Sequence, residues 1–164
     1  MEEGYEVAFR IGTLNLSESS KIVVRPLRPY QMIVCAAPAY LEKWGTPKRP
    51  SDLERHQCLG YMHSDRAVFS EWQFTRDEKT YTALTSGKFR VNDAGAQLRA
   101  AEQGLGVLLG AQDLVADSIA NGKLVQLLTA YQAPWRPFHL LYPADRQKTM
   151  KLRRFIDAAM AKFG

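Results

Sequence analysis

The segment FRVNDAGAQLRAAEQGLGVLLG, residues 89–110, predicts a strand, a helix and a second strand in direct succession. The first strand ends before Asn92 and Asp93, and either side chain can accept the free N–H groups of a helix start. The helix is expected to end at Gly104, because glycine tolerates the left-handed conformation that commonly follows a helix. At helical spacing, the side chains predicted to face inward are Ala94, Leu98, Ala101 and Leu105, with Gln97, Arg99, Glu102 and Gln103 on the surface.

The apolar run at 107–109 is typical of a strand that is buried on both faces of a parallel sheet. In such sheets ligands bind beyond the carboxyl ends of strands, where helix N-termini present free N–H groups. Two junctions of this kind fall in the segment, at 91–92 and at 109–110. An anion site at the helix start is therefore one hypothesis.

Strands and helices alternate outward from this segment, which indicates the α/β class. Further strands are predicted at 5–11, 21–28, 31–37, 57–61, 124–128 and 138–142. Residues 71–76, 80–85 and 88–91 are predicted to be strands joined by tight turns, which makes a meander in the middle of the chain. Pro26 confines its strand to a sheet edge or a strand margin. Helices are predicted at 38–44, 52–56 and 112–120. The apolar stripe of a final helix is Leu152, Phe155, Ile156, Ala159 and Phe163.

The composition is that of a globular chain. Its 164 residues, 46% of them hydrophobic, are enough for one domain or two small lobes with a core. No apolar run approaches the roughly 20 residues that a membrane helix needs, and the first residues have no signal-peptide pattern, so a cytoplasmic location is expected. Cys35 and Cys58 lie far apart and outside any CxxC spacing, which predicts two buried thiols and no zinc or redox site.

The net charge of +5 is dispersed along the chain. A nucleic-acid footprint needs basic residues clustered on one surface, so ordinary solvated faces are the favoured interpretation.

The motifs of common enzymes are missing. The three histidines form no HExxH pattern, and neither a GxSxG elbow nor a phosphate-binding glycine loop occurs. His63 is followed by Ser64 and Asp65, but adjacent residues point apart, whereas a catalytic triad requires convergent geometry. We therefore expect no catalytic residue, no metal and no cofactor.

Polar groups near predicted strand ends remain as candidates for ligand contacts. The planar guanidinium of Arg10 suits a carboxylate, although an ordinary surface ion pair is an equally good interpretation. The full set is Arg10, Tyr61, His63, Ser64, Asn92 and Asp93.

An ordered series of motifs resembles the effector-binding domain of LysR-type transcriptional regulators over nearly the whole chain. The motifs are AFRIG (8–12), AAPAYL (36–41), HQCLGY (56–61), VNDA (91–94), GLGVLLG (104–110) and NGKLVQLL (121–128). The family commonly has Leu-Pro where this chain has Leu109 and Gly110.

The resemblance implies a periplasmic-binding-protein-like fold of two lobes joined by crossing strands, with a small-molecule site between the lobes. By motif, residues 1–31 and 137–164 would form an incomplete lobe one, and residues 32–136 would form lobe two. The implied effector contacts are Arg10, Ile11 and Gly12 from lobe one, and Tyr61, His63, Ser64, Asn92, Asp93 and Gly110 from lobe two. The effector is expected to be a small organic anion.

Such regulators begin with a winged helix-turn-helix, a linker helix and the first half of lobe one, none of which matches this sequence. The resemblance thus implies a fragment that contacts DNA only through an absent N-terminal domain. Its final helix should expose apolar surface and drive homo-oligomer formation, and its effector affinity should be weak. The alternative function is a solute-binding component of a transport system, and an enzyme ranks third.

Overall fold

The computed structural model describes residues 6–12, 21–62, 70–144 and 149–164. The chain forms two compact units, unit 1 from Met1–Tyr30 with Trp135–Gly164, and unit 2 from Gln31–Pro134. The α/β class is confirmed. In chain order the elements are β1 (Ala8–Ile11), β2 (Ile22–Ala36), α1 (Pro38–Trp44), the 3-10 helix η1 (Pro50–Arg55), β3 (Gly60–Tyr61), β4 (Glu71–Arg76), β5 (Lys79–Leu84), β6 (Arg90–Val91), α2 (Ala94–Glu102), β7 (Leu108–Ala111), α3 (Gln112–Ala120), β8 (Val125–Leu127), β9 (Trp135–Pro143) and α4 (Met150–Phe163).

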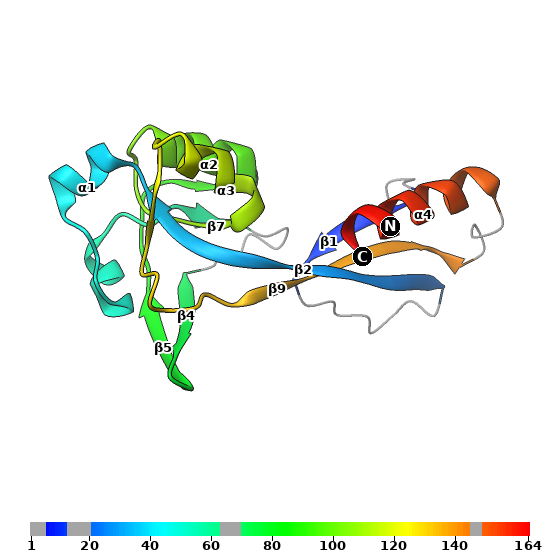
Figure 1. Cartoon of the computed structure of the whole chain (residues 1–164), viewed down its shortest axis with the longest axis horizontal. Coiled ribbons are helices and arrows are strands. Elements are labelled where there is room, and N and C mark those ends of the chain that lie inside the picture. The colour runs from blue at the N-terminus through cyan, green and yellow to red at the C-terminus, as the bar shows by residue number, and fades with distance from the viewer. Residues whose placement is uncertain (1–5, 13–20, 63–69, 145–148) are drawn as a thin grey trace. The chain divides into compact units, whose positions relative to one another are not determined.

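Unit 1 is a small sheet covered by α4, as Figure 1 shows. Strand β9 lies between β1 and the first half of β2, and β1 pairs with β9 antiparallel. Alternate residues of β9 point to one face, where they meet α4. The buried cluster that results contains Leu27, Phe138, Leu140, Tyr142, Leu152, Ile156 and Ala159.

The stripe predicted for α4 is only partly buried. Leu152, Ile156 and Ala159 face the sheet, whereas Phe155 is 43% exposed. The ring of Phe155 lies 6.2 Å from that of Phe9 on the edge strand β1, which is itself 41% exposed. This helix therefore leaves an aromatic pair at the margin of unit 1 and not in its core.

Strand β2 is a single strand of 15 residues, where the sequence predicts two. Its first half borders only β9 among the described strands, so Pro26 does lie in an edge segment. Proline lacks the N–H that a second neighbouring strand would require, and it is tolerated at an edge for that reason. The expected break between residues 28 and 31 is absent.

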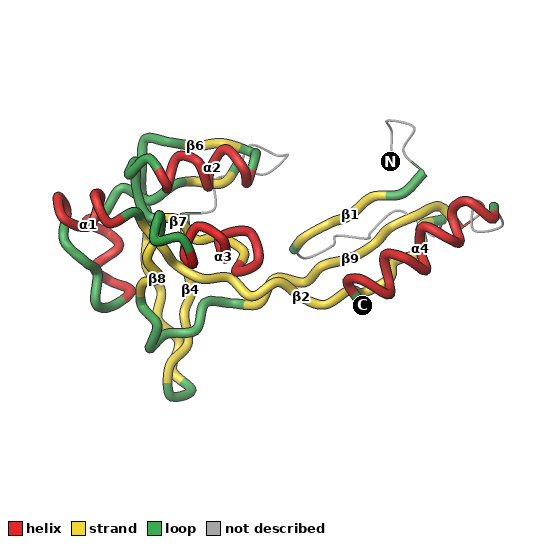
Figure 2. The backbone as a smooth tube through the Cα atoms, turned by 45° about the horizontal axis from the view of Figure 1, so that its top comes forward, coloured by secondary structure: helices red, strands yellow, loops and turns green. Residues whose placement is uncertain are grey.

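Unit 2 is a mixed sheet with helices packed on it (Figure 2). The second half of β2 pairs antiparallel with β7 on one side and with β8 on the other. Beyond β7, Cys58 bridges Val107 in parallel, and β3 then pairs with β6 in parallel. The predicted parallel neighbours of β7 are thus found on one side only.

Helix α2 presents only part of the predicted face to the core, because Ala101 is buried and Leu98 packs against the core as expected, whereas other residues differ. Gln97 is only 5% exposed, while Leu105 is 48% exposed and Ala94 is also on the surface. The amide of Gln97 donates a hydrogen bond of 2.7 Å to the Leu59 carbonyl. This buried bond holds the helix in a rotation that brings Ala100 and Ala101 inward.

Strands β4 and β5 form a hairpin whose buried face carries Trp72, Phe74 and Ala83. Its turn residues Asp77 and Glu78 both have positive φ, 49° and 62°, which matches the twist of a two-residue hairpin. The third strand predicted at 88–91 is present as β6, but it leaves the hairpin and pairs with β3.

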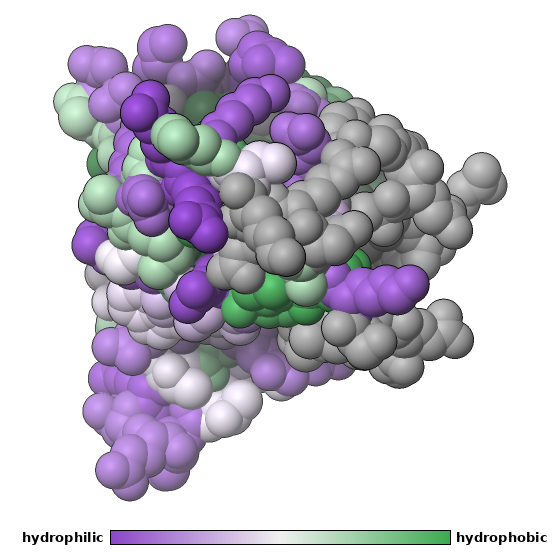
Figure 3. Space-filling view, turned by 90° about the vertical axis from the view of Figure 1, so that its right-hand side faces the viewer, coloured by the Kyte–Doolittle hydropathy of each residue, from purple (hydrophilic) through white to green (hydrophobic). Residues whose placement is uncertain are grey.

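Exposed apolar side chains are scattered over the described surface. On the face drawn in Figure 3, hydrophobic areas lie among hydrophilic ones. Both cysteines are free and buried, as predicted from their spacing.

Candidate functional site

The carboxyl ends of three strands meet at one edge of unit 2. Tyr61 of β3 is level with Val91 of β6, because these strands pair in parallel register. Cys58 and Val107 are register partners in a parallel bridge. Tyr61 and Gly110 follow these partners at equal spacing in the chain, so they are level with each other. Strand ends that run parallel in this way place Tyr61, Asn92 and Gly110 along the same edge, where ligands bind in sheets of this kind.

Tyr61 and Asn92 are in direct contact at this edge. The Tyr61 hydroxyl donates a hydrogen bond of 3.2 Å to the Asn92 carbonyl. This contact fixes the phenol ring across the end of β6 and leaves the Asn92 side chain exposed.

Asp93 is the N-cap residue of α2. Its Oδ1 accepts a hydrogen bond of 2.6 Å from the Ala96 N–H and lies 3.9 Å from the Arg99 guanidinium. The carboxylate therefore already takes the position that an anion would need at this helix start. Chemically, this end of the strand edge is suited to a hydrogen-bond donor of a ligand.

Gly110 contributes backbone atoms only. It is buried opposite Ile33, and a Cβ atom built on it would lie 3.0 Å from Val115 Cγ1. Such a contact is tight, so the close packing of α3 against β7 favours glycine here. The helix begins two residues later, and its N-cap residue Ala111 makes no side-chain cap.

The candidates of unit 1 lie at the end of β1. Arg10 and Ile11 are exposed, and Gly12 has a φ of 99° and donates its N–H to the Pro137 carbonyl at 2.8 Å. Among the described residues, Arg10 has no ion-pair partner. Its register partner His139 has a buried Nδ1 without a hydrogen bond in this part of the chain.

Two predicted residues, His63 and Ser64, lie outside the described residues. The described ranges contain no group of three or more side chains that could hold a metal ion. No helix within them is long and apolar enough to cross a membrane.

A buried polar pair in unit 2 was not among the candidates. The Tyr40 hydroxyl and His56 Nδ1 are 3.1 Å apart, and the Gln57 N–H donates to the same hydroxyl at 2.9 Å. Burial lowers the pKa of His56, and the charge of Asp52 partly opposes that shift. The neutral imidazole fixes the end of η1 to α1, which is a structural role.

Comparison with known proteins identifies a family. The protein-family model described as "LysR substrate binding domain" matches residues 1–164. Among curated relatives, the probable HTH-type transcriptional regulator LtrA of Klebsiella pneumoniae is 29% identical over 96% of this chain and 50% of its own length. The HTH-type transcriptional activator AaeR of Escherichia coli is 31% identical over 95% of this chain and 49% of its own length.

Solved structures give the same result. The regulatory domain of CrgA from Neisseria meningitidis has a TM-score of 0.82 and 26% identity, over 99% of this chain and 77% of that one. The full-length virulence activator AphB of Vibrio cholerae has a TM-score of 0.77 and 25% identity, over 96% of this chain and 52% of that one. The chain spans about half the length of the curated relatives that it matches.

Proposed function

Since the chain belongs to the LysR substrate-binding domain family, we propose that it is the effector-sensing part of a transcription regulator. It binds a small organic anion, and binding changes how subunits of a homo-oligomer are arranged. The observation that carries this proposal is the edge of unit 2 where Tyr61, Asn92 and Gly110 end three neighbouring parallel segments.

In this proposal units 1 and 2 correspond to the two lobes of the family. Arg10 supplies the positive charge from unit 1, because its guanidinium is exposed and has no ion-pair partner among the described residues. The Tyr61 ring and the Asn92 amide supply an apolar surface and hydrogen bonds from unit 2. An effector that contacts both units favours one arrangement of them over others, and this preference is what an oligomer can transmit.

DNA recognition would belong to a separate domain, and the working location would be the cytoplasm, where the DNA is. The relatives described above are transcription regulators, which favours this function over the solute-binding alternative and over an enzyme.

The test is a thermal-shift screen of the purified chain with a panel of small carboxylates at concentrations high enough to detect the weak affinity that is expected, followed by calorimetry on those that raise the melting temperature. We expect Arg10→Gln to weaken binding about tenfold or more, the size of one lost charge-assisted contact. Arg153→Gln, which removes an exposed arginine of α4 in the same unit, is the matched control and should leave the Kd unchanged. A panel without any stabilising carboxylate, or an unchanged Kd in Arg10→Gln, would refute the proposal.

A further inference from the structure

A pocket lies within unit 2 next to the strand edge described above, since Gly60 and Arg90 directly precede Tyr61 and Val91. It has a volume of about 150 Å³ and is lined by Cys58, Gly60, Ser70, Thr85, Ser86, Gly87 and Arg90. None of these residues is among the proposed effector contacts. The pocket lies where the chain leaves the β4–β5 hairpin to form β6, which is the connection that the sequence did not predict.

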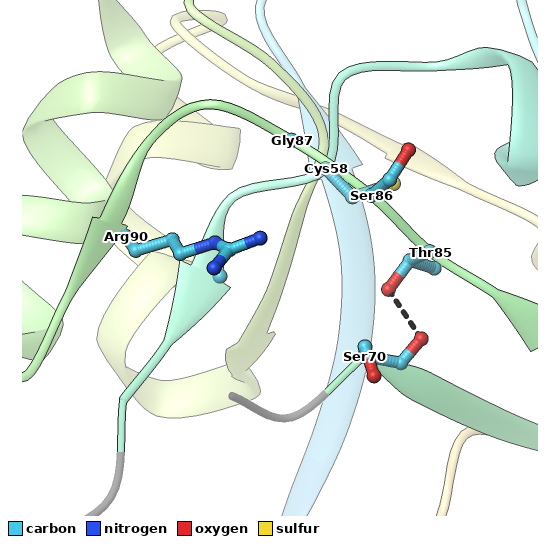
Figure 4. A pocket seen from close by; sticks show the side chains of 7 residues that line it. Cys58, Ser70, Thr85, Ser86, Gly87 and Arg90 are labelled. Carbon is cyan, nitrogen blue, oxygen red and sulfur yellow. Dashed lines mark hydrogen bonds between the residues drawn. The ribbon is translucent and has the colours of Figure 1, made fainter. Parts of the chain in front are cut away.

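The backbone explains why the space is open. Arg90 is the register partner of Gly60, which has no side chain to fill the position beside it. Gly87 lets the β5–β6 connection approach β3 closely, because a Cβ atom there would overlap the Cys58 carbonyl oxygen. Figure 4 shows the Arg90 side chain extending from β6 toward the side of the pocket where Ser70, Thr85 and Ser86 lie.

Two carbonyl oxygens of this pocket are already engaged. The Ser70 carbonyl accepts hydrogen bonds from the Thr85 hydroxyl at 2.8 Å and from the Thr85 N–H at 2.6 Å. The Ser86 carbonyl accepts from the Cys58 N–H at 2.8 Å. These carbonyl oxygens are therefore less available to bind a donor on a ligand.

Three side-chain donors, in contrast, are unused. Within the described residues, the Arg90 guanidinium and the hydroxyls of Ser70 and Ser86 have no hydrogen-bond partner, and Arg90 has no ion pair. None of the lining residues is acidic. Burial raises the pKa of the Cys58 thiol to about 12, so this side chain is also uncharged at neutral pH. The neighbouring Glu71 carboxylate accepts a hydrogen bond of 3.0 Å from the Gln73 amide.

We propose that this pocket is a second ligand site, which binds a small oxyanion through the Arg90 guanidinium and the hydroxyls of Ser70 and Ser86. A cavity of about this volume can hold a molecule of roughly six heavy atoms, since one of similar size binds benzene. A short carboxylate and inorganic phosphate both fit this limit, and both match a guanidinium beside hydroxyl donors. The sequence did not indicate this site. It places Arg90 inside the strand predicted at 88–91, and the pairing of Arg90 with Gly60 is a non-local contact that the sequence pattern does not reveal.

The experiment is a titration of the ¹⁵N-labelled chain with acetate and, separately, with inorganic phosphate at constant ionic strength. We expect saturable amide shifts at Ser86, Gly87 and Arg90, and the stronger of the two titrations identifies the preferred anion. Arg90→Gln should raise the Kd about tenfold or more, and Ser86→Ala should raise it by a smaller factor. Arg55→Gln, an exposed arginine of η1 in the same unit, is the control and should bind like the wild type.

The amide spectrum of each variant also reports whether it is folded. The proposal is overturned if neither anion gives saturable shifts at these amides, or if Arg90→Gln binds as tightly as the control. It is also overturned if the shifts centre on Tyr61 and Asn92, because the anion would then occupy the proposed effector edge. A lack of shifts at Ser86, Gly87 and Arg90 would leave the effector proposal untouched, so the two proposals can fail separately.

Discussion

Replacing Gln97 by methionine tests the buried hydrogen bond that sets the rotation of α2. Methionine has nearly the same length and helix propensity as glutamine, but it cannot donate to the Leu59 carbonyl. Leu59 is 2% exposed, so its carbonyl cannot recover the lost bond from bulk water. Leaving a buried acceptor without its donor costs about 1–3 kcal/mol, and the extra apolar contact of methionine offsets a part of that. We expect a loss of about 1–2 kcal/mol in the free energy of unfolding.

Urea denaturation followed by circular dichroism, and by fluorescence to which the buried Trp72 contributes, measures this change. With a urea dependence of about 2 kcal/mol per molar, the midpoint should fall by about 0.5–1 M. Gln103→Met, at an exposed position just after the same helix, is the control and should stay within about 0.5 kcal/mol of wild type. A Gln97→Met midpoint as high as that of the control would show that the bond does not hold the helix.

Three further outcomes follow from the packing of unit 2. Burial lowers the pKa of His56 in the folded chain. The stability that the neutral imidazole contributes is therefore complete above the unfolded-state pKa of about 6.5, and it is lost as the pH falls through the lower folded-state pKa. Urea midpoints should therefore fall more between pH 8 and pH 5 in wild type than in His56→Gln, and equal falls would contradict the assignment. Gly106→Ala should destabilise the chain by about 2 kcal/mol or more, because its Cβ would overlap a backbone oxygen. Gly95→Ala in helix α2 should be neutral or stabilising by up to about 1 kcal/mol, and thermal melts that rank the two variants the other way would refute this. Burial raises the pKa of both Cys35 and Cys58 to about 12, so iodoacetamide should label neither thiol until urea unfolds the chain, as mass spectrometry can show.

Local patterns in the sequence were sufficient for most of the elements. The strand, helix and strand of 89–110 are present, as are the cap at Asp93 and the final amphipathic helix. Each depends on residues within one or two turns of each other, where periodicity and capping chemistry carry the information.

Pairing between distant segments could not be predicted in the same way. The sequence favours a meander in which the strand at 88–91 pairs with the strand before it. In the structure Arg90 pairs instead with Gly60, thirty residues away in the chain. The predicted face of α2 is wrong at Gln97 for a related reason, because its amide is buried and bonds to the distant Leu59 carbonyl. For the candidate site, strand ends indicated Tyr61 and Asn92, which are in contact, and their role in binding stays a prediction. The donor cluster around Arg90 depends on non-local pairing that the sequence does not reveal.

The two ends of the chain build unit 1, and this has a consequence for synthesis on the ribosome. Ala8 of β1 finds its register partner at Leu141, about 130 residues later. At about 5–20 residues per second, β1 waits on the order of ten seconds before its partner strand is made. During that time unit 2, a contiguous stretch, is already complete. Until β9 is made, the edge of β1 that pairs with this strand has no partner, and an unpaired strand edge is prone to pair with other chains.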